Sequence, residues 1–310
     1  IETPDRPQEI GTEMTDSLDT RSIIEQGQLN FTVAPKRQTI WGGREAFVFS
    51  LEGIGVGVFL AFMLAGQVTA MITGLGLLAL AVLLLLSHLG HPSRAWMAIR
   101  NVRRSWISRG TVMIGFFLAL GGLYVGSFLL PGSGAREALA PLPEVLLALA
   151  GLFILLYPGF AMATSPAIPF WNNGLMPILS LANGLASGGL ILVAVAATTK
   201  ASPVPAPLDT LVAGELLVLA CLTLFLASYI AVMRRAGAAA QLSVRVLLND
   251  NRGLFWGGIV VVGLVVPIVL VATNLSVSAS DLWFGVAARL VGDVALRHGL
   301  LKAGVYDAVL

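Results

Sequence analysis

Eight apolar stretches constrain this chain most, because each has the roughly 20 residues that a helix needs to cross a bilayer core. They are residues 45–67, 70–89, 111–131, 143–164, 174–199, 209–233, 254–274 and 281–303. Charged residues make up 12% of the chain, whereas soluble domains carry roughly 25%. We therefore predict an all-α polytopic membrane protein with eight transmembrane helices.

Basic residues are distributed unevenly over the loops between these stretches. Eight passes place both chain ends on one face, and sixteen of the 19 Lys and Arg residues fall on that face. Arg136 and Lys200 fall on the other face, and Arg289 lies within the last stretch. Because positive charge accumulates in cytoplasmic loops, we expect a multi-pass protein of the cytoplasmic (inner) membrane with both termini cytoplasmic.

Residues 1–40 form a polar arm that carries seven acids before Lys36 and only two arginines, Arg6 and Arg21. It has no basic start followed by an apolar core, so we expect no secretory signal there. Two interpretations stay open. The arm is either a disordered tail or a strap that becomes ordered on a partner subunit.

Two small-residue patterns indicate an internal repeat. Gly53 and Gly57 follow Glu52 in the first stretch, and Gly184 and Gly188 follow Asn183 in the fifth. Glycines four residues apart let membrane helices approach closely. Since the two stretches run in the same direction, we predict two parallel four-helix bundles, residues 41–165 and 166–310. Chance is the alternative, because glycine is common in membrane helices.

A carboxylate and an imidazole lie near the same membrane face. Glu52 follows Arg44 by eight residues, which places it about 12 Å into the membrane, where an acid is costly and points to function. His88 ends the second stretch at that face and titrates near neutrality. The pair suits proton-coupled reduction of a lipid-soluble molecule. A packing hydrogen bond between helices is the alternative.

Residues 91–109 are predicted to form an amphipathic interfacial loop. Pro92 suits the first turn of a helix. Four apolar residues then share one helical face, and the arginines lie off that face. The apolar residues are Ala95, Ile99, Val102 and Trp106, and the arginines are Arg100, Arg103 and Arg104. A basic loop with no further role is the alternative.

Few residues of this chain suit metal chemistry. Cys221 is the single cysteine, which excludes an iron–sulfur cluster or a four-cysteine zinc site held by this chain alone. The three histidines lie at one end of the predicted spans, so they do not form the axial pairs of a di-haem cytochrome b. We expect no haem and no metal in this chain. Arg289 and Asp293 form an i, i+4 pair inside the last stretch, either as a structural ion pair or as part of a proton relay.

Three segments together resemble the NrfD-type membrane subunits of molybdopterin oxidoreductases, which include the anchors of dimethyl sulfoxide reductase and polysulfide reductase. The most specific runs from His88-Leu89-Gly90 through Arg94-Ala95-Trp96 to Ser108-Arg109. The others are Pro169-Phe170-Trp171-Asn172, with the Ser187-Gly188 region after it, and Leu296-Arg297 with residues 301–306. The resemblance covers about residues 40–306. Two positions depart from it: Gly110 stands where many relatives have an acid, and His298 where they often have tyrosine.

The resemblance implies a haem-free subunit that passes electrons between the quinone pool (menaquinone or ubiquinone) and an iron–sulfur partner of the four-cluster ferredoxin-like type. A molybdopterin subunit then acts on the substrate, so this chain is not catalytic for that substrate. His88 is expected to serve the quinone, with Glu52 as relay and Arg94 and Asn101 orienting the ring. We expect no nucleic-acid partner. The residues expected to dock the partner are Arg100, Arg103, Arg104, Arg109 and Lys302.

A second class of function also fits the sequence. Eight helices, an internal repeat and ionisable residues inside the spans are typical of an ion- or proton-coupled secondary transporter. The two interpretations predict different binding partners, because an electron-transfer subunit should co-purify with redox proteins and a transporter should purify alone.

Overall fold

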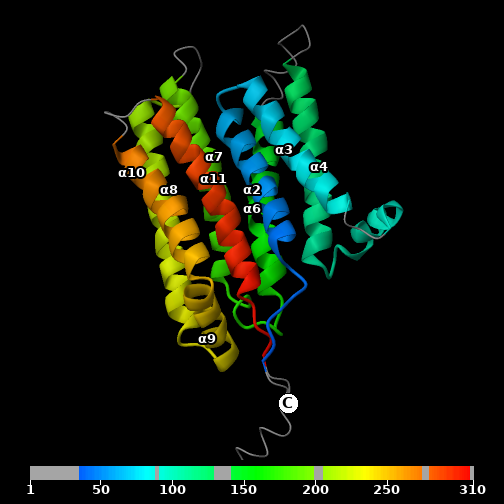
Figure 1. Ribbon diagram of the computed structural model, residues 1–310. Helices are drawn as coiled ribbons and strands as arrows, with labels where there is room; N and C mark the ends of the chain where they lie inside the picture. The colour runs from blue at the N-terminus through cyan, green and yellow to red at the C-terminus, as the bar shows by residue number, and fades with distance from the viewer. Residues whose placement is uncertain (1–34, 88–90, 129–140, 199–204, 274–278, 308–310) are drawn as a thin grey trace, which may run out of the picture.

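The computed structural model describes residues 35–87, 91–128, 141–198, 205–273 and 279–307. Within these ranges the chain is helical and has no strand, and its long helices run side by side as one bundle (Figure 1). The elements are α2 (Gly43–Met63), α3 (Val68–Ser87), η1 (Pro92–Asn101), α4 (Trp106–Ser127), α6 (Pro141–Ala163), α7 (Leu175–Thr198), α8 (Leu208–Met233), α9 (Ala238–Arg245), η2 (Val246–Asp250), η3 (Gly253–Val265), α10 (Val266–Ala272) and α11 (Ala279–Lys302).

Seven helices of the described chain are long and apolar enough to cross a membrane, which confirms a multi-pass membrane protein. They are α2, α3, α4, α6, α7, α8 and the continuous pair of η3 and α10, Gly253–Ala272. The predicted eighth span corresponds to α11, which has 24 residues but too many charges to qualify by composition. Two of these charges, on Arg289 and Asp293, are buried inside the bundle.

The two glycine patterns of the sequence pack against each other where α2 crosses α7. A Cβ atom added at Gly188 would collide with the backbone of Gly57, and one added at Gly53 would lie 3.7 Å from the Cα of Gly184. Side chains at these positions would push the two helices apart. Glycine therefore sets the helix separation at the centre of the bundle.

The helices contact one another both within each half of the chain and between the two halves. In the first half α2 packs on α3 and α6, and α4 packs on α3 and α6. In the second half α7 packs on α8 and α11, while α10 contacts both α8 and α11. Extensive contacts of α2 with α7 and α11, and of α6 with α7, join the two halves into one bundle.

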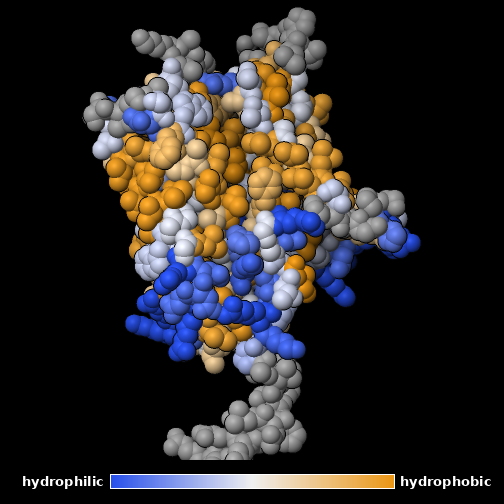
Figure 2. Space-filling model, viewed as in Figure 1, coloured by the Kyte–Doolittle hydropathy of each residue, from blue (hydrophilic) through white to orange (hydrophobic). Residues whose placement is uncertain are grey.

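The two ends of the described chain meet at one end of the bundle. Arg37 and Val305 form an isolated antiparallel bridge, the Gln38 N–H donates to the Gly304 carbonyl (2.9 Å), and the Tyr306 N–H donates to that of Lys36 (2.8 Å). Hydrophilic surface gathers at this end and apolar surface covers the middle of the bundle (Figure 2). We call it the polar end. Residues 1–34 of the predicted arm lie outside the described residues.

The predicted interfacial loop at 91–109 differs from the structure in two ways. Its helix, η1, is a 3-10 helix over Pro92–Asn101, and it projects sideways from the bundle (Figure 1). It ends earlier than expected because Ser105 caps α4, accepting a hydrogen bond from the Ser108 N–H (3.3 Å). An N-cap serine takes an extended backbone conformation and starts a new helix, so Trp106–Arg109 belong to α4.

Candidate functional site

Glu52 is buried in α2, with 1% of its surface exposed. The Tyr157 hydroxyl, from α6, donates to its Oε2 at 2.6 Å. Tyr157 has room for its ring because α4 places Gly110 there, and a Cβ at Gly110 would collide with that ring. The glycine that departs from the family pattern therefore makes space for the phenol that stabilises Glu52.

Arg297 brings positive charge to Glu52 from α11. It interacts electrostatically with the Glu52 carboxylate, and its guanidinium lies against Gly53, 2.7 Å from where a Cβ would stand. Its Nε forms an ion pair with Asp293 Oδ1 at 3.1 Å, and its Nη1 donates to Ser180 Oγ at 3.3 Å. A buried acid and a buried base are thus held together between α2, α7 and α11.

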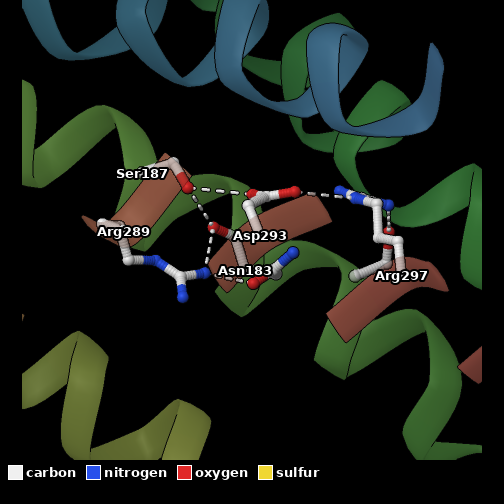
Figure 3. A network of polar contacts seen from close by, with 6 residues as sticks. Asn183, Ser187, Arg289, Asp293 and Arg297 are labelled. Carbon is white, nitrogen blue, oxygen red and sulfur yellow. Dashed lines mark hydrogen bonds and ion pairs between the residues drawn. The ribbon is translucent and has the colours of Figure 1, made fainter. Parts of the chain in front are cut away.

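The polar contacts continue along α7 and α11 (Figure 3). The Ser187 hydroxyl contacts Asp293 Oδ2 at 2.9 Å and the Asn183 carbonyl at 3.1 Å. Arg289 donates to the side-chain oxygen of Asn183 and to the carbonyl of Gly263 at 2.9 Å. Each of these charged groups is therefore hydrogen-bonded, as buried charges in a membrane interior require.

The expected ion pair between Arg289 and Asp293 is not the one that forms. Asp293 pairs with Arg297, which is equally an i, i+4 neighbour on the helix. Arg289 turns instead toward α7 and η3, because a close contact between Gly292 and Gly263 brings the π-helical η3 against α11. Sequence spacing alone does not distinguish the two neighbours of Asp293.

Comparison with known proteins places the chain in a family. The family described as "Polysulphide reductase, NrfD" matches residues 36–307. The chain belongs to the NrfD family. It is also similar to the protein NrfD of Escherichia coli (strain K12), with 26% identity over 269 residues, which is 76% of this chain and 81% of the relative.

In this NrfD-family chain, the residues expected around the quinone do not all lie together. His88 is outside the described residues. The residue before His88 is Ser87, the last residue of α3. Because α2 and α3 pack antiparallel, with Gly55 against Gly74, Ser87 lies at the same height in the bundle as the start of α2. That level is about 14 Å from Glu52 along α2. Arg94 and Asn101 are exposed on η1, which projects from the bundle, so the structure does not bring them to Glu52.

The expected docking residues divide into two groups. Arg100, Arg103, Arg104 and Lys302 are exposed. Arg109 instead binds within the chain: its Nε donates to the Val102 carbonyl (2.9 Å) and its Nη2 to that of Arg103 (2.8 Å). Its guanidinium also lies over the Trp106 ring, 4.5 Å from the ring centre. Arg109 therefore joins the turn after η1 to the start of α4. A partner could bind its guanidinium only by breaking these hydrogen bonds.

The second and third NrfD motifs hold the polar end together. The Trp171 indole N–H donates to the Leu300 carbonyl at 2.9 Å, and the Tyr229 hydroxyl donates to that of Phe170. Gly304 lies against the face of Trp171, where a Cβ would stand 2.9 Å from the ring. These motif residues join the loop before α7 to α8 and to the end of α11.

Sequence reasoning missed Tyr157, Glu215 and the position of Arg297 beside Glu52. Glu215 is a buried acid on α8 that interacts electrostatically with Arg289. An acid within a 26-residue apolar helix was the signal that identified Glu52, and it applies equally to Glu215. The described residues contain no cluster of three or more His, Cys, Asp or Glu side chains that suits a metal ion.

A groove at the polar end brings a second histidine into consideration. It has a volume of about 500 Å³ and is apolar except for His298 at its border. It runs between α2, η3 and α11 and is lined by Phe47, Leu254, Leu290, Val291, Val294, Ala295 and His298. His298 lies beside the start of α2, where it interacts with the Gly42 backbone and its Nδ1 is 3.5 Å from where a Cβ of Gly43 would stand. His298 is therefore a second histidine at the polar end that can be compared with His88 as a quinone ligand.

Proposed function

We propose that this chain is the membrane anchor and quinone/quinol-binding subunit of a multisubunit molybdopterin oxidoreductase. It would pass electrons between an iron–sulfur partner and the membrane quinone pool. Membership of the NrfD family supports an anchor of this kind. The observation that carries the quinone role is the buried pair of Glu52 and Tyr157, because few tasks other than proton handling repay an acid at that depth.

The chemistry of the pool substrate explains why such residues are needed. Reduction of one quinone consumes two electrons and two protons, and a proton donor acts at about 2.6–3.2 Å from the accepting oxygen. Glu52 Oε1 has no hydrogen-bond partner among the described residues and can accept or release a proton. We assign His88 as the donor to the quinone carbonyl and Glu52 as its relay. Arg94 and Asn101, which are exposed on η1, are not assigned to this site.

We further infer eight passes, arranged as a parallel repeat of residues 41–165 and 166–310. The meeting of the two described chain ends supports an even number of passes, and α11 supplies the eighth. The charges of α11 are tolerated because they face other helices rather than lipid. The concentration of basic residues at the polar end supports a cytoplasmic position for that end in the inner membrane.

The exposed arginines of η1 and the following turn are proposed to dock the iron–sulfur subunit. Arginine suits interfacial ion pairs because its planar guanidinium binds carboxylates through two parallel hydrogen bonds. Arg100, Arg103, Arg104 and Lys302 are exposed at this end. The molybdopterin subunit would attach through that partner.

A kinetic comparison of histidine variants tests the quinone site. His88→Ala should abolish quinone-coupled turnover, while a dye that exchanges electrons directly with the soluble subunits should still react. His298→Ala is the matched control at the same end of the bundle, and it should keep quinone turnover. Full quinone turnover in His88→Ala, with unchanged apparent affinity, would place the site elsewhere, and its loss in His298→Ala alone would place the site at the His298 groove.

A secondary transporter is the second candidate function, favoured by the buried charges of α11. The composition of the purified material separates the two. The anchor should co-purify with iron and molybdenum from its partners. A chain that purifies alone and moves a solute into vesicles would support the transporter.

A further inference from the structure

Glu215 is a buried acid that the proposed quinone chemistry does not use. It lies seven residues into α8, about 10 Å from the end of the bundle opposite the polar end. Its side chain is 3% exposed, and its Oε1 has no hydrogen-bond partner among the described residues. An acid held there without such a partner requires a functional explanation.

The neighbouring helices leave room for the carboxyl group of Glu215. A Cβ at Gly189 on α7 would collide with its Oε2, so glycine makes room for the carboxyl group. The carboxyl also borders a cavity of about 360 Å³ between α2, α7 and α8. This cavity reaches Thr210, which is exposed in the first turn of α8. Glu215 therefore faces the end of the bundle away from the proposed quinone site.

On its other side, Glu215 adjoins a line of buried polar groups that leads to Glu52. Arg289 interacts electrostatically with Glu215, and Arg297 with Glu52. The hydrogen bonds of Figure 3 connect the two arginines along α7 and α11. In order the groups are Glu215, Arg289, Asn183, Ser187, Asp293, Arg297 and Glu52; hydrogen bonds join Arg289 to Arg297, and electrostatic interactions link the two glutamates to the arginines.

Unpartnered polar atoms mark the same line. Four buried side-chain nitrogen or oxygen atoms of this line have no hydrogen-bond partner among the described residues. They are Glu52 Oε1, Asn183 Nδ2, Arg289 Nε and Glu215 Oε1. Water molecules satisfy such atoms in protein interiors by donating and accepting hydrogen bonds, and the same hydrogen bonds carry protons between titratable groups.

We propose that Glu215 is a proton port, and that the line from Glu215 to Glu52 carries protons between the quinone site and the face opposite the polar end. The proposal rests on the proposed quinone function. Reduction of one quinone takes two electrons from the partner and two protons through the line. For each proton an O–H bond forms on Glu215 and then breaks as the proton moves toward Glu52. Electrons and protons thus reach the quinone from opposite faces, and each turnover moves charge across the membrane. Quinol oxidation runs the same steps in reverse.

The test uses the complex purified with its redox partners and reconstituted in liposomes that contain a pH-sensitive dye. Quinone-coupled turnover and the pH change inside the vesicles are measured together, with and without a protonophore. Glu215→Gln should slow proton movement and quinone-coupled turnover together, on the order of 100-fold and with or without protonophore, while a dye that reacts directly with the soluble subunits should still be turned over. Glu215→Asp should restore proton movement, which separates a lost carboxyl group from a misfolded chain. Asp209→Asn is the matched control, because Asp209 is exposed six residues earlier on α8.

The outcomes are distinguishable. Turnover without any transmembrane proton movement in the unaltered complex would overturn the proton port and leave the quinone function standing. Equal proton movement in Glu215→Gln and the unaltered complex would also overturn it. Absence of quinone turnover in the unaltered complex would overturn the proposed function itself.

Discussion

At the residue scale, the stability of the site depends on how its buried charges are paired. Asp293 is fully buried, and its ion pair with Arg297 leaves no water to replace a lost partner. Arg37 and Asp250 form another ion pair, and both are half-exposed. The same type of contact therefore has different energetic weight in the two places.

We predict that Asp293→Asn lowers the free energy of unfolding by about 3 kcal/mol or more, because it leaves the Arg297 guanidinium buried without its counter-charge. Asp250→Asn should cost under about 1 kcal/mol, since water solvates Arg37 once the pair is broken. Denaturant unfolding in mixed detergent micelles, followed by tryptophan fluorescence, measures both. Equal losses in the two variants would show that burial does not decide the cost.

Sequence reasoning reached some of these residues and not others, for physical reasons. Glu52 was found because an acid inside an apolar stretch is conspicuous. Tyr157 was not, because tyrosine is ordinary in a membrane helix and only the fold shows that it lies over Gly110. The close ion pair of Asp293 with Arg297 was not predicted, because the residues four before and four after Asp293 are both arginines. Hydrogen-bond partners across helices depend on packing that a single sequence does not encode locally.

At the element scale, apolar length predicted to within a few residues the positions of the seven helices of the described chain that are long and apolar enough to span a membrane. The helix type was less accessible. Residues 253–265 form a π-helix and residues 92–101 a 3-10 helix. Gly263 of the π-helix packs closely against Gly292 of α11. The amino-acid composition of a segment does not distinguish a π-helix or a 3-10 helix from an α-helix.

The crossing of α2 and α7 gives a prediction at this scale. Gly188→Leu should separate the two helices and lower stability by about 2 kcal/mol or more, since the new side chain would meet the backbone of Gly57. Gly122→Leu on α4 is the control, because a Cβ at Gly122 meets nothing within 4 Å. Thermal unfolding of the two detergent-solubilised variants measures the difference. A Gly122→Leu variant as unstable as Gly188→Leu would show that helix contact is not the cause.

At the scale of the whole molecule, the pairing of residues 36–38 with 304–306 fixes both described chain ends at the polar end. Together with the proposed eight passes, this makes the two faces of the protein chemically different. One carries most of the basic residues, and the other adjoins the cavity at Glu215. Partner docking and proton uptake would then occur on opposite faces.

Cysteine labelling tests this topology. In a Cys221→Ser background, cysteines placed at Lys36 and Lys302 should react with a membrane-impermeant maleimide from one side. A cysteine at Asp209, at the start of α8, should react from the other side. Inverted membrane vesicles and intact spheroplasts provide the two orientations. Reaction of Lys36 and Asp209 positions from the same side would contradict eight passes.

Reduction of the partner's iron–sulfur clusters by quinol tests the electron-transfer role most directly. Membranes that contain the partner subunits, with or without this chain, are mixed with a reduced quinone analogue, and the clusters are followed by electron paramagnetic resonance. We predict cluster reduction only when the chain is present, with its loss in His88→Ala. If the reduction potentials of the clusters are too low for quinol to reduce them, the clusters are first reduced chemically, and their re-oxidation by added quinone is measured instead. Electron exchange that proceeds equally without the chain, or that is absent in both directions with it, would contradict a quinone-reactive subunit.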